Sequence, residues 1–340
     1  MGTTACVGPL EIDYVGPEDA GAVPPAPEID AQIRLLDGST PPAVDGGGPT
    51  PHPIPGYDGG APPPGIDAGP PPAPLDPLAP PQARYHSFDE VADFIELLAE
   101  RHPDRVRLDT YGTSPGGRPL YYVRISDAVG VDEGEPAALI NFAIHGDEII
   151  TVECALDLLY TLVERYDDDA RVRSIVDGND LYVVPVVSPD SFSRRSREEE
   201  GVDPNRQFPH RDAPGRRSIT VVDAAVSFFE ARTFEGTLDF HAFGELILLP
   251  HGESFDRAAN YPELSMIASE LAAVGGYEPT QISHMFGSPV FGGSVDYYQW
   301  RGTGIHLGVE MATSKSPPTS AIGGLRDTAT EMALRFVEAL

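Results

Sequence analysis

Cysteine, lysine and long hydrophobic runs are all scarce in this 340-residue chain. Its two cysteines, Cys6 and Cys154, lie in segments of different character, and we expect no disulfide between them. Cys154 falls in an apolar helical pattern that is typical of a buried thiol. Lys315 is the only lysine. Because no run of about 18 apolar residues occurs, we expect no membrane-spanning segment.

Positive charge is also scarce. The chain has 23 Lys and Arg residues against 53 Asp and Glu residues, which gives a formal net charge of -30. A chain this acidic is repelled by phosphate backbones and by anionic lipids, so we expect neither nucleic acid nor an anionic membrane as a partner. An acidic surface also keeps a protein soluble, so the charge indicates no particular activity.

Proline is abundant but unevenly distributed, because 21 of the 36 prolines precede Arg84. Glycine and aspartate fill much of the same region, for example in residues 59–81. This composition cannot bury enough apolar surface to offset the loss of chain entropy, which predicts an extended tail over residues 1–83 and a folded domain over residues 84–340. Stalks of this kind commonly tether exported domains, so we expect export and a tether, although no signal peptide is visible.

From residue 85 onward the pattern is that of a folded domain. Ser87, followed three residues later by Glu90, matches a capping box, and apolar residues then recur at helical spacing. Segments of helical periodicity alternate with predicted strands. Residues 137–144 and 180–187 are continuous apolar strands, residues 236–250 read as one or two strands, and residues 304–311 read as a strand. This alternation indicates an α/β fold with a mixed, mostly parallel central sheet and helices on both faces.

Ionisable residues follow four of these strands, at the edge where α/β sheets bind ligands. They are His145 with Glu148 at the next helix, His241, Glu310, and a polar loop with Arg194, Arg195, Arg197, Asn205 and Arg206. Each has an ordinary explanation when taken singly: a loop hydrogen bond, the attraction of an acid to a helix N-terminus, or a solvated charge. Those explanations do not predict that all of them meet at one edge of one sheet.

Two imidazoles and one carboxylate are the protein ligands typical of catalytic zinc. His145 and Glu148 have a spacing that suits a loop after a strand and the first turn of a helix, and His241 supplies the third ligand. A further carboxylate beside the metal can act as a general base, and Glu310 is the best candidate. The guanidinium and amide groups of the loop suit a substrate carboxylate.

Four segments, in order, carry a resemblance to one family. They are "HGDE" (145–148), "GVDPNRQFP" (201–209), "LDFHAFGELILLP" (238–250) and "FGGSVDYYQWRGTGIHLGVEM" (291–311). From residue 85 to residue 340 the chain resembles the zinc carboxypeptidases of the carboxypeptidase A/B type. The resemblance implies one zinc ion on His145, Glu148 and His241, with Glu310 as the catalytic base.

The same resemblance implies a substrate. Asn205 and Arg206 match the motif that binds the terminal carboxylate of a peptide, and Val295 falls where the family reads the last side chain. An apolar residue at that position favours apolar termini. The expected activity is therefore hydrolysis of the C-terminal peptide bond of peptides or proteins, with a preference for apolar C-terminal residues.

Three further positions follow from the resemblance. Arg197 matches the arginine that stabilises the oxyanion, with Arg195 as the alternative. Asp203 matches the acid that orients the His145 ring. Ser288 stands where the family usually has a tyrosine that closes over the substrate, which predicts weaker binding or slower turnover rather than lost chemistry.

Other functions stay open at this point. A zinc acylase acting on small N-acyl amino acids, or a peptidoglycan peptidase of the same fold, would use similar ligands. A non-catalytic binding module is the third possibility. The complete set of ligands and base favours an active zinc peptidase.

Overall fold

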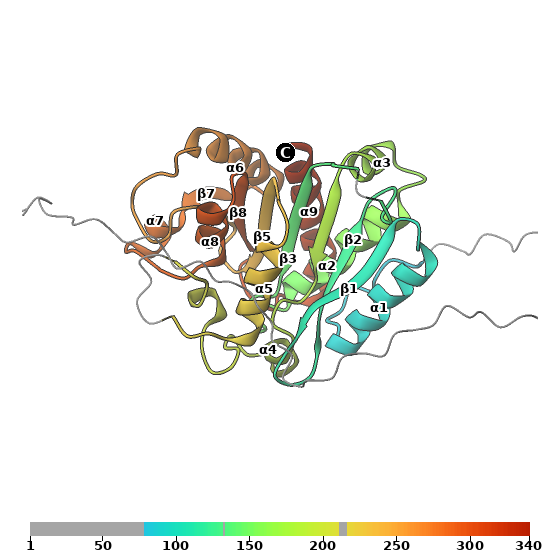
Figure 1. The fold of residues 1–340 in the computed structure, drawn as a ribbon, viewed down its shortest axis with the longest axis horizontal. Helices are drawn as coiled ribbons and strands as arrows, with labels where there is room; N and C mark the ends of the chain where they lie inside the picture. The colour runs from blue at the N-terminus through green and yellow to red at the C-terminus, as the bar shows by residue number, and fades with distance from the viewer. Residues whose placement is uncertain (1–77, 132, 211–215) are drawn as a thin grey trace, which may run out of the picture. The chain divides into compact units, whose positions relative to one another are not determined.

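The computed structural model describes residues 78–131, 133–210 and 216–340 (Figure 1). The chain divides into two compact units, Met1–Pro71 and Pro72–Leu340, of which the first lies outside the described residues. Most of the tail predicted over residues 1–83 also lies outside them, as does Cys6, so the extended tail and the boundary at residue 84 stay predictions. Everything below concerns the described part of the second unit.

An eight-stranded sheet forms the centre of this unit, in the order β1-β2-β4-β3-β5-β8-β6-β7. The neighbours β4, β3, β5 and β8 run parallel, β6 pairs with β7 in parallel, and the β1/β2, β2/β4 and β6/β8 pairs are antiparallel. The mixed, mostly parallel sheet is therefore confirmed. The strands are β1 (Val106–Thr113), β2 (Pro119–Ile125), β3 (Ala137–Phe142), β4 (Asp180–Val184), β5 (Gly236–Ala242), β6 (Leu246–Leu249), β7 (Glu278–Gln281) and β8 (Ile305–Met311).

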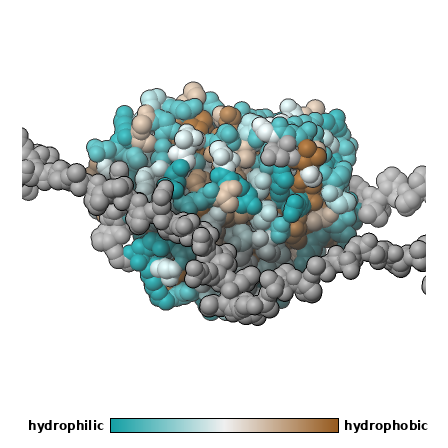
Figure 2. Space-filling model, viewed as in Figure 1, coloured by the Kyte–Doolittle hydropathy of each residue, from teal (hydrophilic) through white to brown (hydrophobic). Residues whose placement is uncertain are grey.

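Helices cover both faces of the sheet. The helices are α1 (Phe88–Arg101), α2 (Ile150–Glu164), α3 (Ala170–Asp177), α4 (Pro189–Arg194), the 3-10 helix η1 (Pro204–Arg206), α5 (Thr220–Glu230), α6 (Tyr261–Gly275), α7 (Ile282–Phe286), α8 (Ser294–Arg301) and α9 (Thr319–Glu338). Ile140 of β3 packs in a core cluster with residues of α2, α6 and α9, whereas its neighbour Leu139 packs in a second cluster with α5 and α8. Successive strand residues thus point into two separate cores. In the view of Figure 2, most of the coloured surface is hydrophilic.

Several local predictions are confirmed. Ser87 and Glu90 form the predicted capping box, since the Glu90 N–H donates to Ser87 Oγ at 3.3 Å and the Ser87 N–H donates to Glu90 Oε2 at 2.8 Å. Cys154 is a buried free thiol. The polar loop expected after β4 begins instead with α4, a six-residue helix that starts at Pro189, because proline is well suited to a first helical turn. In residues 78–131, 133–210 and 216–340, no helix combines the length and apolar character needed to cross a membrane.

The sheet register determines where the site lies. β3 pairs in parallel with β5, with Phe142 opposite Phe240, and β5 pairs in parallel with β8, with His241 opposite Glu310. His145 follows the end of β3 by three residues. The carboxyl ends of these central strands therefore place the predicted ligands and the predicted base at one edge of the sheet.

Candidate metal centre

Three donor side chains converge at this edge. His145 lies in the loop after β3, Glu148 lies two residues before α2, and His241 belongs to β5. His145 Nδ1 lies 2.9 Å from Glu148 Oε1, and His241 Nδ1 lies 3.2 Å from Glu148 Oε2 and 3.3 Å from His145 Nδ1. All three side chains are at most 4% exposed. Two imidazoles and a carboxylate thus meet at one largely buried point.

These distances fit a zinc ion. Nitrogen and oxygen ligands bind tetrahedral zinc at about 2.0–2.2 Å, which places neighbouring donor atoms roughly 3.3 Å apart. The three separations here run from 2.9 to 3.3 Å. Two imidazole nitrogens 3.3 Å apart cannot both carry a proton toward each other, so at least one presents its lone pair to the common point. The donor set is that of a single zinc site.

The turn between β3 and α2 has little freedom. A Cβ on Gly146 would lie 2.1 Å from the backbone nitrogen of Phe192, so only glycine fits between the two ligands of "HGDE". Thr151 Oγ donates to the Glu148 carbonyl at 2.8 Å and accepts from the Ala143 N–H at 3.2 Å. The ligand loop is therefore fixed at both ends before any metal binds.

Glu148 is held in its charged form. Burial alone would raise the pKa of its carboxyl, but His145 and His241 hold that pKa well below its usual range. Lys315 Nζ lies 3.7 Å from Glu148 Oε1 and donates to Asp147 Oδ2 at 2.7 Å. Asp147 therefore pairs with the only lysine and stays outside the ligand set. The composition alone did not reveal this role of Lys315.

Asp203 and Arg197 contact the ligand side chains. Asp203 Oδ1 is 3.0 Å from His145 Nε2, and Asp203 Oδ2 accepts from Arg197 Nε at 3.0 Å and Nη2 at 2.9 Å. Burial would raise the pKa of Asp203, but its hydrogen bond to His145 and the charge of Arg197 hold it well below the usual range. Arg197 Nη1 also lies 3.2 Å from Glu148 Oε1.

Arg195, the alternative to Arg197, points elsewhere. Its Nη2 donates to the His86 carbonyl at 3.1 Å, and its guanidinium lies over the Phe192 ring at 4.5 Å. The structure thus brings Arg197, and not Arg195, to the ligand set. The two side chains diverge because Arg195 ends α4 in the left-handed conformation.

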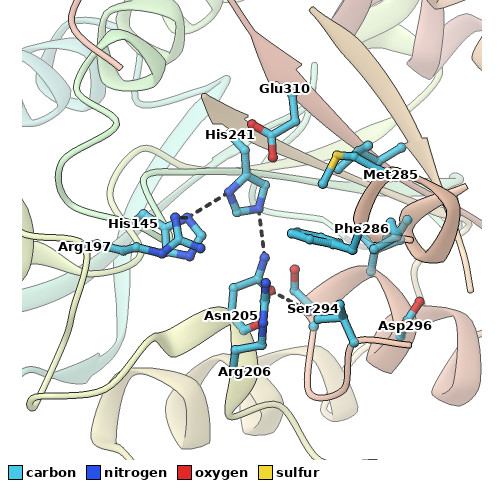
Figure 3. Close-up of a pocket in the computed structure, with 15 residues that line it drawn as sticks. His145, Arg197, Asn205, Arg206, His241, Met285, Phe286, Ser294, Asp296 and Glu310 are labelled. Carbon is cyan, nitrogen blue, oxygen red and sulfur yellow. Dashed lines mark hydrogen bonds between the residues drawn. The ribbon is translucent and has the colours of Figure 1, made fainter. Parts of the chain in front are cut away.

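A pocket open to solvent adjoins the ligands (Figure 3). Asn205 and Arg206 line it, and Asn205 is fixed because its Oδ1 accepts from the Ser294 N–H at 2.8 Å while its Nδ2 lies 3.3 Å from His241 Nε2. The apolar part of the wall is formed by Leu248, Ile282, Met285, Phe286, Val290 and Val295. All the predicted substrate-binding residues therefore lie in one pocket with the ligands.

Phe286 and Met285 in this wall were not predicted. Phe286 is 47% exposed, and the Arg206 guanidinium lies 5.4 Å from the centre of its ring. Figure 3 shows the Phe286 ring directed toward His241 and Asn205. α7, which carries both residues, has only five residues and no strong periodicity, so the sequence offered no signal for its position.

Glu310 stands at the other side of the ligands. It lies beside His241 in the sheet, and Figure 3 shows its carboxylate next to the His241 ring. Burial raises the pKa of Glu310 to about 7. A carboxyl group with a pKa close to neutral pH can both accept and release a proton.

Ser288, at the position where the family usually has a tyrosine, is exposed and does not line the pocket. The nearby tyrosines do not replace it. Tyr297 donates to Glu230 Oε1 at 2.9 Å, and the Tyr298 hydroxyl lies 3.4 Å from Asn141 Nδ2. Both rings are buried, and neither lines the pocket.

Comparison with known proteins agrees with this site. A sequence model of the zinc carboxypeptidase family matches residues 91–332. A zinc carboxypeptidase of Saccharothrix mutabilis subsp. capreolus is 25% identical over 70% of this chain and 63% of its own length. Carboxypeptidase A1 of Bos taurus is 28% identical over 63% of this chain and 59% of its own length. The chain thus spans roughly three fifths of these relatives.

Solved structures show the same fold. Thrombin activatable fibrinolysis inhibitor superposes with a TM-score of 0.69 and 22% identity, covering 75% of this chain and 74% of that one. Carboxypeptidase A of Helicoverpa armigera gives 0.68 and 19%, covering 76% and 74%. With the family model spanning most of the chain and the zinc ligands in place, this protein belongs to the zinc carboxypeptidase family.

Proposed function

We propose that this chain is a zinc-dependent carboxypeptidase that hydrolyses the C-terminal peptide bond of peptides with apolar C-terminal residues. One observation carries the proposal. The two histidine ligands, Glu310, a guanidinium with an amide, and an apolar wall all border the same pocket. An enzyme that removes one terminal residue needs these four elements together.

The terminal carboxylate is bound by Arg206 and Asn205. A guanidinium offers paired N–H donors to a carboxylate, and Asn205 adds an amide donor beside it. Arg206 is partly buried, and its Nη1 donates to the Asn205 carbonyl at 2.6 Å, which fixes the guanidinium at the pocket. A peptide without a free C-terminus would leave these donors unpaired.

When bound, zinc supplies a Lewis acid that polarises the scissile carbonyl and lowers the pKa of water to about 7. Glu310 accepts the proton of the attacking water and then passes it to the leaving amine. Arg197 places its positive charge beside the ligands, where it stabilises the negative charge that develops on the carbonyl oxygen. Asp203 accepts from His145 Nε2 and so directs the Nδ1 lone pair toward the metal.

The apolar preference rests on the wall and on the acids near it. Val295 is 4% exposed and lies among apolar neighbours. Asp296, beside it, is occupied: its carboxylate accepts from the Gly252 and Glu253 N–H groups, and burial together with the adjacent Glu253 holds its pKa well above the usual range. A basic terminal side chain would therefore find the Asp296 carboxyl already engaged.

Hydrolysis of blocked dipeptides ending in Phe, Leu, Lys or Arg tests this proposal. We expect Phe and Leu substrates to be cleaved, the activity to disappear with a chelator, and added zinc to restore it. Activity that survives complete zinc removal contradicts the mechanism. A clear preference for Lys or Arg contradicts the specificity alone.

Export and tethering are proposed only from the composition of residues 1–83. Cell fractionation with an antibody against residues 84–340 tests them. Recovery of the protein outside the cytoplasm supports export, and recovery solely in the cytoplasm contradicts it.

A further inference from the structure

A second group of side chains that could hold a metal ion includes Asp296, which lines the pocket. His251 and Glu253 belong to the loop after β6, Asp296 belongs to α8, and one ligand atom of each lies within 4.8 Å of the others. His251 Nδ1 is 2.9 Å from Glu253 Oε1. His210, which follows η1, brings its Nε2 to 3.3 Å from the same oxygen. We refer to these four residues as the outer cluster.

Two donor atoms of the outer cluster are not satisfied by the protein. His251 Nδ1 and Glu253 Oε2 are shut off from solvent, yet neither has a hydrogen-bond partner among the residues that the structure describes. His251 Nδ1 lies close to Glu253 Oε1, but off the direction of a hydrogen bond. Buried polar atoms without partners are rare in proteins, and an ion is one accepted explanation.

The backbone holds the outer cluster in place. The Gly252 N–H lies 2.9 Å from both oxygens of Asp296, and the Glu253 N–H donates to Asp296 Oδ2 at 3.1 Å. Gln281 Nε2 donates to the His251 carbonyl at 3.1 Å and ties the same loop to the end of β7. The donors are therefore pre-positioned by contacts that do not depend on any ion.

We propose that His251, Glu253 and Asp296 bind a second divalent metal ion of the zinc class, with His210 as a neighbouring donor. An imidazole with two carboxylates is a mixed nitrogen and oxygen set that zinc accepts. Two carboxylates in contact repel each other unless a proton or a cation lies between them. A bound ion removes that repulsion and satisfies the two orphaned atoms.

This site is separate from the first. It shares no ligand with His145, Glu148 and His241. Asp296 directly follows Val295 in α8 and also lines the pocket, so an ion here would stiffen the wall that reads the terminal side chain. Its role is to hold the specificity pocket, and hydrolysis itself proceeds at the first site.

The competing arrangement uses a proton in place of the ion. Asp296 would then stay protonated and donate to Glu253. Zinc binding must displace that proton, so the two arrangements differ in measurable proton release as well as in metal content.

Zinc titration of the metal-free full chain distinguishes the arrangement with a bound ion from the arrangement with a proton. We expect wild type to bind two zinc ions, and Glu253→Gln and His251→Ala to bind one each. The exposed His284, which stacks on Phe255 at 5.6 Å, supplies a matched control, and His284→Ala should still bind two. His145→Ala should retain only the outer ion, which tests the second site independently of the first.

A single zinc ion in wild type at saturating metal overturns the proposal, whether or not peptides are hydrolysed. Equal stoichiometry in wild type and His251→Ala overturns it as well. Should the Glu253 variant fold poorly by circular dichroism, the wild-type and His145→Ala titrations still decide. Loss of peptide hydrolysis with both ions bound would instead count against the proposed function.

Discussion

His241 and Glu310 occupy directly paired positions on the neighbouring parallel strands β5 and β8. Adjacent strands lie about 4.8 Å apart, so the backbone hydrogen bonds of the sheet fix the distance between a metal ligand and the proposed base. His145 reaches the same place from the loop after β3. The reacting groups are thus held by the most rigid part of the molecule.

The first prediction concerns Asp203. Replacing it in Asp203→Asn leaves the ring of His145 without its charged partner, so we expect zinc at the first site to bind roughly 10–100-fold more weakly. Competition titration with a fluorescent chelator measures this. Asp109→Asn, on β1 away from the pocket, should change zinc affinity by less than about twofold. Unchanged affinity in Asp203→Asn would show that the carboxylate does not orient the ring.

The second prediction concerns Phe286. Because its exposed ring lies at the pocket and over Arg206, Phe286→Ala should raise KM for peptides ending in Phe, with little change in kcat. Aromatic contacts contribute about 1 kcal/mol, which corresponds to a change of roughly fivefold. Peptides ending in Ala serve as the internal control, since a small side chain gains little from the ring. An equal rise in KM for both substrates would argue against a specific contact.

The third prediction concerns the Arg206 guanidinium. Arg206→Lys keeps the charge but loses the paired donors, so kcat/KM for free C-termini should fall by at least about tenfold. A C-terminally amidated peptide should be cleaved poorly by both proteins. Equal kcat/KM in wild type and Arg206→Lys would place the carboxylate elsewhere.

The fourth prediction concerns pH and stability. His306 is fully buried, and burial lowers its pKa to about 3, whereas its unfolded value is about 6.5. Below pH 6.5 the unfolded chain therefore binds a proton that the native protein does not. Stability from this residue is complete above pH 6.5 and falls by about 3 kcal/mol by pH 4.

Urea unfolding of the metal-free protein at pH 7 and pH 4 tests this. The difference in unfolding free energy between wild type and His306→Gln should shift by about that amount, because other titrating groups are common to both. For the exposed His284→Gln the difference should stay constant. A constant difference for His306→Gln would mean that the native protein accepts the proton.

The central strands were predictable because β3 and β4 are almost wholly apolar and β5 and β8 are mainly apolar, as burial on both faces of the sheet requires. The long helices α2, α6 and α9 were predictable from the helical spacing of their apolar residues. Short elements carry too few residues to show such a pattern. β7 has only four residues at the sheet edge, of which Gln281 alone is buried, and tertiary contacts decide its pairing.

The residues of the site also fall into those that the sequence predicts and those that it does not. The zinc ligands could be predicted because they lie at or just after the ends of mainly apolar strands, and the sheet then determines their meeting point. Met285 and Phe286 lie on α7, and Lys315 lies in the segment after β8, so their positions depend on how loops pack. The choice between Arg195 and Arg197 also depended on one left-handed residue at the end of α4.

Glu310→Gln tests the central claim most directly. The amide cannot accept a proton, while the zinc ligands are unchanged, so kcat should fall by about 10²–10⁴-fold at an unchanged zinc content. Glu263→Gln, exposed on α6, is the control and should keep wild-type kcat. A zinc-loaded Glu310→Gln protein that hydrolyses peptides within a few fold of the wild-type rate would contradict the account.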